Sequence, residues 1–291
     1  MFGYSDDNWI LAPSLSALQD ILSTCEEYAK THNLQFSTDV DPKKCKTKCM
    51  AFLNKPRVLP SMYLCDNPLP WVDKLKHLGN MVSNKVDGCQ LDISQKRAQY
   101  IDKTNSINQE FFCSHPAAKL KLNTIYNCHF SGSPIWDMFS PGAKHYESTF
   151  NKSVKIMCGL PFETHKNLIQ PLIGGPGFRI QLIRKYLSFI NSVKKSTKPV
   201  MMQLYSLAKQ DVRTITGRNL RNILMMTNLQ SVDELEPAIV SSIEYNSILE
   251  EDKWRVNTIK EILDMKYGEL NIPAGWTNSE LEDILKYCCV S

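Results

Sequence analysis

The clearest periodic pattern in the first part of the chain lies between residues 15 and 32. Apolar side chains recur there three and four positions apart with polar residues between them, and this set is Leu18, Ile21, Leu22, Cys25, Tyr28 and Ala29. The spacing predicts an amphipathic helix that packs one face on the rest of the fold. Ser14 or Ser16 is expected to cap the start of this helix, and Asn33 suits the left-handed conformation at its end.

Short apolar runs on either side of this helix predict strands. Phe2-Gly3-Tyr4 and Trp9-Ile10-Leu11-Ala12 flank the adjacent acids Asp6 and Asp7, which predicts two short strands joined by a tight turn that holds both carboxylates. Further strands are expected at residues 34–36, 48–53, 62–64, 69–72 and 75–79. Asp39 and Asp41, close to Pro42, are interpreted as turn residues.

From about residue 92 the pattern becomes helical and stays so. Helices are expected within residues 92–111, 123–130, 150–160, 178–193, 201–209, 218–226, 235–248, 254–265 and 278–287. Trp136 and Phe139 are expected to be core aromatics, because such an aromatic pair usually faces inward. The glycine-rich stretch 174–177 matches no phosphate-binding motif and is interpreted as a linker. The expected fold is α+β, with short antiparallel hairpins and one helix in residues 1–85 and a mostly helical remainder.

The composition excludes several classes of protein. A length of 291 residues favours two subdomains, and 43% hydrophobic with 22% charged residues is typical of a globular protein. No stretch approaches the ~20 apolar residues of a membrane span, and the acidic start does not resemble a signal peptide. The ten cysteines follow no zinc-binding spacing, which favours reduced thiols in an intracellular protein of the cytoplasm or nucleus, neither secreted nor membrane-spanning.

The charge is distributed unevenly along the chain. Residues 142–222 contain 14 Lys and Arg against 3 Asp and Glu, a net +11, whereas residues 230–270 contain 4 against 10, a net −6. A basic region of this kind is the electrostatic footprint of a protein that binds a polyanion such as nucleic acid. Solvated helix faces explain the same charges equally well, so both interpretations stay open at this point.

The adjacent acids are the first candidate for chemistry. Two fixed carboxylates that face one cavity suit Mg²⁺ or Mn²⁺, which prefer oxygen ligands. Taken alone, however, an Asp-Asp pair favours a surface turn, because Asp hydrogen-bonds its own backbone there.

The context of this pair changes that interpretation. Phe2-Gly3-Tyr4-Ser5-Asp6-Asp7 resembles the F-x-Y-[A/V/S]-D-D core of reverse transcriptases. The amphipathic helix, the Pro42-Lys43-Lys44 loop, the strand beginning at Lys46-Thr47-Lys48 and the Leu75-Lys76-His77-Leu78-Gly79 motif follow in the order found in LINE-type (non-LTR) retrotransposon reverse transcriptases. The resemblance is specific to about residue 82 and good to about residue 185, where Ile135-Trp136-Asp137 resembles the region after the palm.

The resemblance implies an RNA-directed DNA polymerase (nucleotidyltransferase) fold and its partners. Residues 1–85 would be a partial palm, residues 86–180 a helical thumb-like region and residues 181–291 a helical C-terminal extension. The partners would be an RNA template and a DNA primer, with a deoxynucleotide in the full-length enzyme.

The resemblance also implies roles for single residues. Asp6 and Asp7 match the acids that hold Mg²⁺ or Mn²⁺ in two-metal nucleotidyl transfer, with Asp6 the more direct ligand. Tyr4 would lie beside the primer terminus, and either Lys44 or Lys46 near the departing pyrophosphate. The residues that match the primer grip, which positions the nucleic-acid backbone, are Lys76, His77, Leu78 and Gly79. His77 as a packed histidine, and Leu78 with Gly79 as core and turn, are the structural alternatives.

The sequence departs from the family in one respect. A palm needs a further metal-binding Asp on a strand before this hairpin, and neither that Asp nor the fingers precede Phe2. We therefore expect a polymerase fragment that is inactive alone and does not hold the metal ions, because catalysis depends on a preorganised site. The alternatives are a non-catalytic nucleic-acid-binding helical module that uses residues 142–222, and an inert retroelement remnant.

Overall fold

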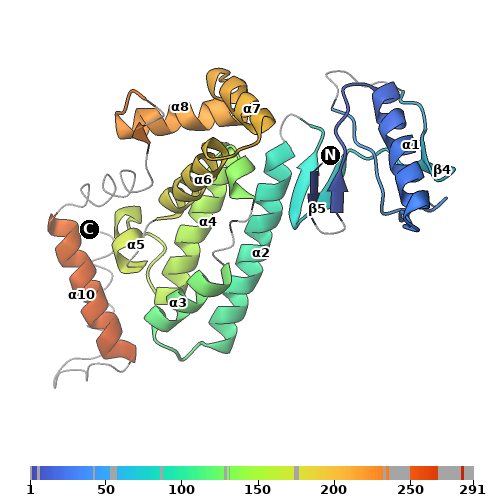
Figure 1. Ribbon diagram of the computed structural model, residues 1–291. Coiled ribbons are helices and arrows are strands. Elements are labelled where there is room, and N and C mark those ends of the chain that lie inside the picture. The colour runs from blue at the N-terminus through green and yellow to red at the C-terminus, as the bar shows by residue number, and fades with distance from the viewer. Residues whose placement is uncertain are drawn as a thin grey trace. The chain divides into compact units, whose positions relative to one another are not determined.

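The computed structural model describes residues 2–4, 7–41, 43–52, 58–85, 88–127, 130, 132–173, 177–231, 234–235, 250–267 and 283–284. The chain divides into two compact units, Met1–Gly88 and Cys89–Ser291 (Figure 1). The fold is mixed α and β with helices predominating, which confirms the coarse fold class.

The first unit is built around α1 (Leu15–Thr31). Ser14 caps the helix by accepting a hydrogen bond from the backbone N–H of Ala17 at 3.2 Å, and Asn33 just beyond the helix has a φ of 53°. Both features confirm the predicted boundaries, because helix capping depends on local sequence.

Three hairpins accompany this helix among the described residues. They are β1 (Phe2–Tyr4) with β2 (Asp7–Trp9), β3 (Met62–Leu64) with β4 (Asn67–Leu69), and β5 (Lys74–His77) with β6 (Asn80–Ser83). Each pair is antiparallel and forms its own two-stranded sheet.

Two polar side chains of α1 join the helix to the β3–β4 hairpin. The amide of Gln19 both donates to the carbonyl of Tyr63 at 2.9 Å and accepts from its N–H at 3.0 Å, so it replaces a neighbouring strand. Glu26, two helical turns after Gln19, accepts a hydrogen bond from the backbone N–H of Cys65 at 3.0 Å. These contacts stabilise a turn in which Cys65 and Asp66 both have positive φ, as in the type I′ turns of tight hairpins.

The small core of this unit contains two of the cysteines that were expected to be reduced. Cys45 and Cys49 are buried together with Leu22, Met62, Leu64 and Leu69. Burial raises the pKa of the Cys49 thiol to about 11, with a smaller contribution from the neighbouring Cys45. Cys49 is therefore a packed, protonated thiol.

Two predicted strands in this unit are wrong, and the strand predicted at 69–72 lies instead at Asn67–Leu69. Residues 34–36 form no strand, and within 48–53 the described residues contain only an isolated bridge between Cys49 and Trp71. Leu34 and Phe36 are exposed and bond to no neighbouring strand, so apolar alternation alone did not specify pairing. The turn interpretation of Asp39 and Asp41 is confirmed, because each carboxylate accepts a backbone N–H two residues ahead.

The second unit is helical in its described part. It contains α2 (Gly88–Glu110), α3 (Pro116–Asn127), η1 (Ser133–Ile135), α4 (Pro141–Cys158), α5 (Lys166–Ile173), α6 (Phe178–Lys194), α7 (Pro199–Gln210), α8 (Ile215–Thr227) and α10 (Glu250–Tyr267). None of the described helices is both long and apolar enough to cross a membrane.

The helices before and after residue 180, the expected boundary of the thumb-like region, share one hydrophobic core. It takes buried side chains from α2, α4, α5, α6, α7, α8 and α10, and its aromatic centre is Tyr100, Phe130, Trp136, Tyr146, Phe150 and Phe178. The observed division of the chain lies at Gly88, close to the expected boundary at 85, and α4 and α6 contact each other within the same unit.

Trp136 is fully buried at this centre, which confirms its prediction as a core aromatic. Its indole N–H donates to the buried carboxylate of Asp92 at 2.7 Å. The amide of Asn219 donates to the Trp136 carbonyl at 2.7 Å and accepts from the N–H of Met138 at 3.2 Å. This network fixes the irregular 136–139 segment, because buried polar groups must be hydrogen-bonded.

Several helix boundaries differ from the predictions. α3 begins at Pro116 and ends at Asn127, earlier than the expected 123–130. α4 begins at Pro141, directly after its N-cap residue Ser140. Its C-cap residue is Gly159, whose φ is 63°, so this glycine rather than Pro161 ends the helix. The predicted helix at 235–248 and most of that at 278–287 lie outside the described residues.

Candidate nucleic-acid site

The first hairpin of the chain pairs β1 with β2. Phe2 pairs with Trp9, Gly3 with Asn8 and Tyr4 with Asp7. Asp7 therefore belongs to β2, whereas the sequence placed both acids in the turn. Asp6 lies outside the described residues, and the side chains of Tyr4 and Asp7 are not described.

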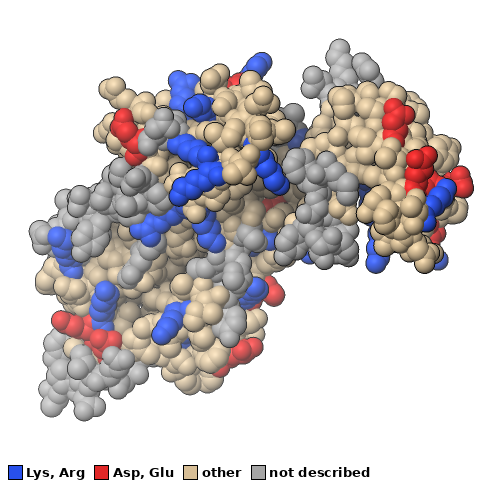
Figure 2. Space-filling model, in the orientation of Figure 1, with Lys and Arg blue, Asp and Glu red and all other residues tan. Residues whose placement is uncertain are grey.

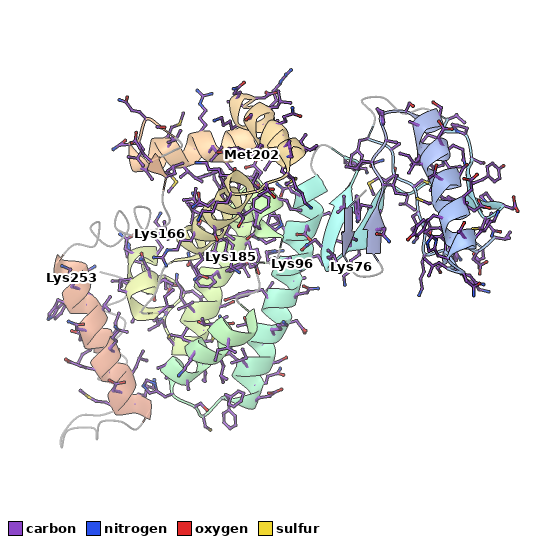
Figure 3. The ribbon with its side chains drawn as sticks, viewed as in Figure 1. Lys76, Lys96, Lys166, Lys185, Met202 and Lys253 are labelled. Atoms are coloured by element: carbon purple, nitrogen blue, oxygen red, sulfur yellow. The ribbon has the colours of Figure 1, made fainter. Side chains whose placement is uncertain are left out.

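The β5–β6 hairpin carries the residues that match the primer grip. Lys74 and Lys76 are exposed on β5, while Leu75 and His77 alternate with them and are half-buried (Figure 3). Leu78 and Gly79 form the two-residue turn, with φ values of 46° and 79°. Positive φ is unfavourable for leucine, and its side chain is 49% exposed, so this turn presents a strained apolar tip to solvent.

The structure brings these two hairpins into contact. The indole ring of Trp9 on β2 packs edge-on against the imidazole of His77 on β5, with ring centroids 4.8 Å apart and an interplanar angle of 66°. The segment 7–9 and the segment 74–77 are therefore neighbours, although 68 residues separate Trp9 from His77. This role of Trp9 was not predicted from the sequence, where its position two residues after Asp7 was the available signal.

Lys44 and Lys46 are the two lysines that match the position near the departing pyrophosphate. Lys44 and Lys46 are both exposed, on either side of the buried Cys45. The thiol of Cys45 donates to the Thr47 carbonyl at 3.0 Å, a bond within the loop itself.

The donor set for a metal ion consists of the acidic pair. Two carboxylates adjacent in sequence fit a divalent cation with oxygen ligands. Asp7 is the first residue of β2, and Asp6, which precedes it in sequence, lies outside the described residues. Among the described residues, which exclude Asp6, no three His, Cys, Asp or Glu side chains gather as a metal site.

The second unit carries the basic surface. Figure 2 shows Lys and Arg side chains spread over one face of it, and Figure 3 places Lys96 on α2, Lys166 on α5 and Lys185 on α6. Two of the three acids in residues 142–222 are already neutralised by arginines of the same region: Glu147 pairs with Arg179 and Asp211 with Arg213. Arg213 also lowers the pKa of Asp211 by hydrogen bonding.

Comparisons with known protein-family models, with curated protein sequences and with solved structures find no match to this chain.

Proposed function

We propose that this chain derives from the RNA-directed DNA polymerase of a LINE-type non-LTR retrotransposon and that its first unit holds the primer terminus. The observation that carries the proposal is the contact between Trp9 and His77. In two-metal nucleotidyl transfer the primer 3′-hydroxyl must lie at the metal ions, so the segment that grips the primer must adjoin the metal-binding hairpin.

The residues would act in the following way. Asp6 and Asp7 would supply carboxylate oxygens to Mg²⁺ or Mn²⁺, which lowers the pKa of the primer hydroxyl and neutralises the leaving pyrophosphate. Tyr4, which pairs with Asp7 across the hairpin, would contact the primer end. Lys76 and the exposed tip at Leu78 and Gly79 would contact the primer backbone.

Polymerase activity is tested by primer extension with Mg²⁺ and deoxynucleotides on an RNA template. The expected result is no templated incorporation by the chain alone, because one carboxylate pair does not preorganise two metal ions. Incorporation that disappears in Asp6→Ala would contradict this expectation and support an active enzyme. Binding of the primer–template is measured separately, since it does not require turnover.

A second candidate function is supported by the charge of the helical unit: non-catalytic binding of nucleic acid through residues 142–222. Lys152, Lys166 and Lys195 are exposed within this region. If the surface makes roughly four phosphate contacts, affinity for an RNA–DNA duplex should fall about a hundredfold between 50 and 200 mM salt.

Fluorescence anisotropy at several salt concentrations measures this dependence. A triple change of Lys152, Lys166 and Lys195 to Glu should weaken binding and flatten the salt dependence. The matched control is the same triple change at Lys253, Lys260 and Lys266 on α10, in the acidic region. Salt-insensitive binding, or equal loss in both triples, would argue against a specific basic surface.

A further inference from the structure

The helix pair α7 and α8 borders a shallow, open cleft, which is separate in sequence from the hairpins of the proposed primer site. The cleft has a volume of about 540 Å³, within the 300–1,000 Å³ that is typical of ligand pockets. Its apolar lining consists of Val212, Leu220, Leu224, Met225 and Leu229. Two cations, Lys209 and Arg221, complete the rim, and none of the described residues that line it is acidic.

The floor of this cleft is part of the protein core. Leu220 is buried, and Leu224 and Leu229 pack against the same core from the open side. Below them the turn between the helices is held tightly: Thr214 caps α8 by accepting from the N–H of Gly217 at 3.0 Å. A Cβ on Gly217 would lie 2.3 Å from the carbonyl oxygen of Asp211, so the two helices meet backbone to backbone. The cleft is therefore preformed rather than opened by a ligand.

The lining chemistry restricts the occupant. Nucleobases are bound mainly by stacking on aromatic rings, and the described residues of this lining include no aromatic side chain. The walls instead offer aliphatic and methionine side chains, which adapt to aliphatic partners. Val212 and Met225 are 45% and 60% exposed at the two lips, so the apolar surface continues beyond the cleft.

The rim charges add a second restriction. Lys209 and Arg221 are both exposed, and the nearest acid in sequence, Asp211, is occupied by the two-point hydrogen bonding of Arg213 at 3.0 and 2.9 Å. An apolar strip bordered by cations complements a helix with an apolar stripe and acidic flanks.

We propose that this cleft binds an acidic amphipathic helix of a partner protein. Aliphatic side chains three or four residues apart would enter the cleft, and acidic side chains would face Lys209 and Arg221. The cleft belongs to the second unit, so the proposal does not rest on the primer site, although Lys209 and Arg221 belong to the 142–222 region of the second candidate function.

The test uses the full chain and a fluorescein-labelled 18-residue peptide of Leu and Glu, with Leu at i, i+3, i+4 and i+7 spacing. Two control peptides have the same leucines scattered around the helix, or Lys in place of every Glu. Fluorescence anisotropy should show saturable binding of the first peptide only. Met225→Glu and Arg221→Glu should each weaken it at least about tenfold, the range of a central contact.

The matched control is Met226→Glu, because Met226 is the next residue of α8, is 42% exposed and does not line the cleft. Its affinity for the peptide should equal that of the unchanged chain, and circular dichroism checks that all variants are folded. No saturable binding, equal binding of the control peptides, or equal loss in Met225→Glu and Met226→Glu would overturn the proposal. Self-association in sedimentation that Met225→Glu abolishes would also overturn it, since the occupant would then be a second copy.

Discussion

Trp9 and His77 pack ring against ring with centroids 4.8 Å apart, and this contact joins the hairpin of the acidic pair to the hairpin of the strained Leu78–Gly79 turn. Both hairpins are two-stranded, and an isolated two-stranded hairpin is marginally stable in water. The ring contact is therefore expected to stabilise both elements.

The contact is tested by a double-mutant cycle of Trp9→Leu and His77→Leu. The coupling energy should be about 0.5–1.5 kcal/mol, as for other aromatic pairs. The free energy for each variant is obtained from the hydrogen-exchange protection of residues 74–83. The control is the stacked pair of Tyr28 on α1 and His32 at the end of this helix, whose replacement by leucine should leave that protection unchanged. Additive effects of Trp9→Leu and His77→Leu would argue against the coupling.

Gly217 fixes the junction of α7 and α8. Alanine is the better helix former by about 1 kcal/mol, but at this position its methyl group would meet backbone atoms of Ala208 and Asp211 within 2.9 Å. Gly217→Ala should therefore destabilise the helical unit by about 1–3 kcal/mol, the range for overpacking. Urea denaturation measures the change.

The control for this substitution is Gly142→Ala in α4. The added methyl group meets the side-chain amide of Gln90, which can rotate away. Gly142→Ala should be neutral or slightly stabilising because of its helix propensity. Equal destabilisation by both variants would mean that helix packing at Gly217 is not the cause.

The stability of the first unit should depend on pH through Glu26. A hydrogen bond from Lys30, followed by that from the Cys65 N–H, lowers the pKa of this carboxyl below its ordinary value of 4.5. A lowered pKa in the folded state contributes stability that is present above pH 4.5 and lost as the pH falls through the folded value.

Glu26→Gln removes this titration. The protection of residues 62–69, measured by hydrogen exchange and corrected for intrinsic rates, should be greater in the unchanged chain at pH 6 and converge with the variant at acidic pH. Glu27→Gln is the control, because Glu27 is the adjacent, exposed carboxylate. A difference between the unchanged chain and Glu26→Gln that does not shrink on acidification would contradict the assigned role.

Local signals explain which parts of the fold the sequence could predict. Ser14 and Asn33 marked both ends of α1, whereas the strand predicted at 75–79 ends at His77 because Leu78 and Gly79 form a turn with positive φ. The strand predicted at residues 34–36 is wrong because a strand needs a hydrogen-bonded partner. The alternation of apolar and polar residues within one segment does not specify that partner. The helix α4 ends at its left-handed C-cap residue Gly159, two residues before Pro161.

Long-range relationships could not be predicted in this way. The Trp9–His77 contact, the Gln19 amide on Tyr63 and the Asn219 amide between Trp136 and Met138 each join segments more than 40 residues apart. No periodicity links such residues, since tertiary packing decides which faces meet. The resemblance to reverse transcriptases supplied the order of the motifs, whereas their adjacency required the structure.

The central claim, that the first unit holds a primer terminus, is tested most directly by photo-crosslinking. An RNA template is annealed to a DNA primer that ends in 4-thiothymidine, bound to the full chain and irradiated, and the crosslinked peptides are identified by mass spectrometry. The account predicts crosslinks within residues 2–9 and 74–83, and their loss when the photoreactive base is moved ten base pairs from the primer end. Crosslinks confined to Cys89–Ser291, or the same pattern from both primer positions, would contradict it.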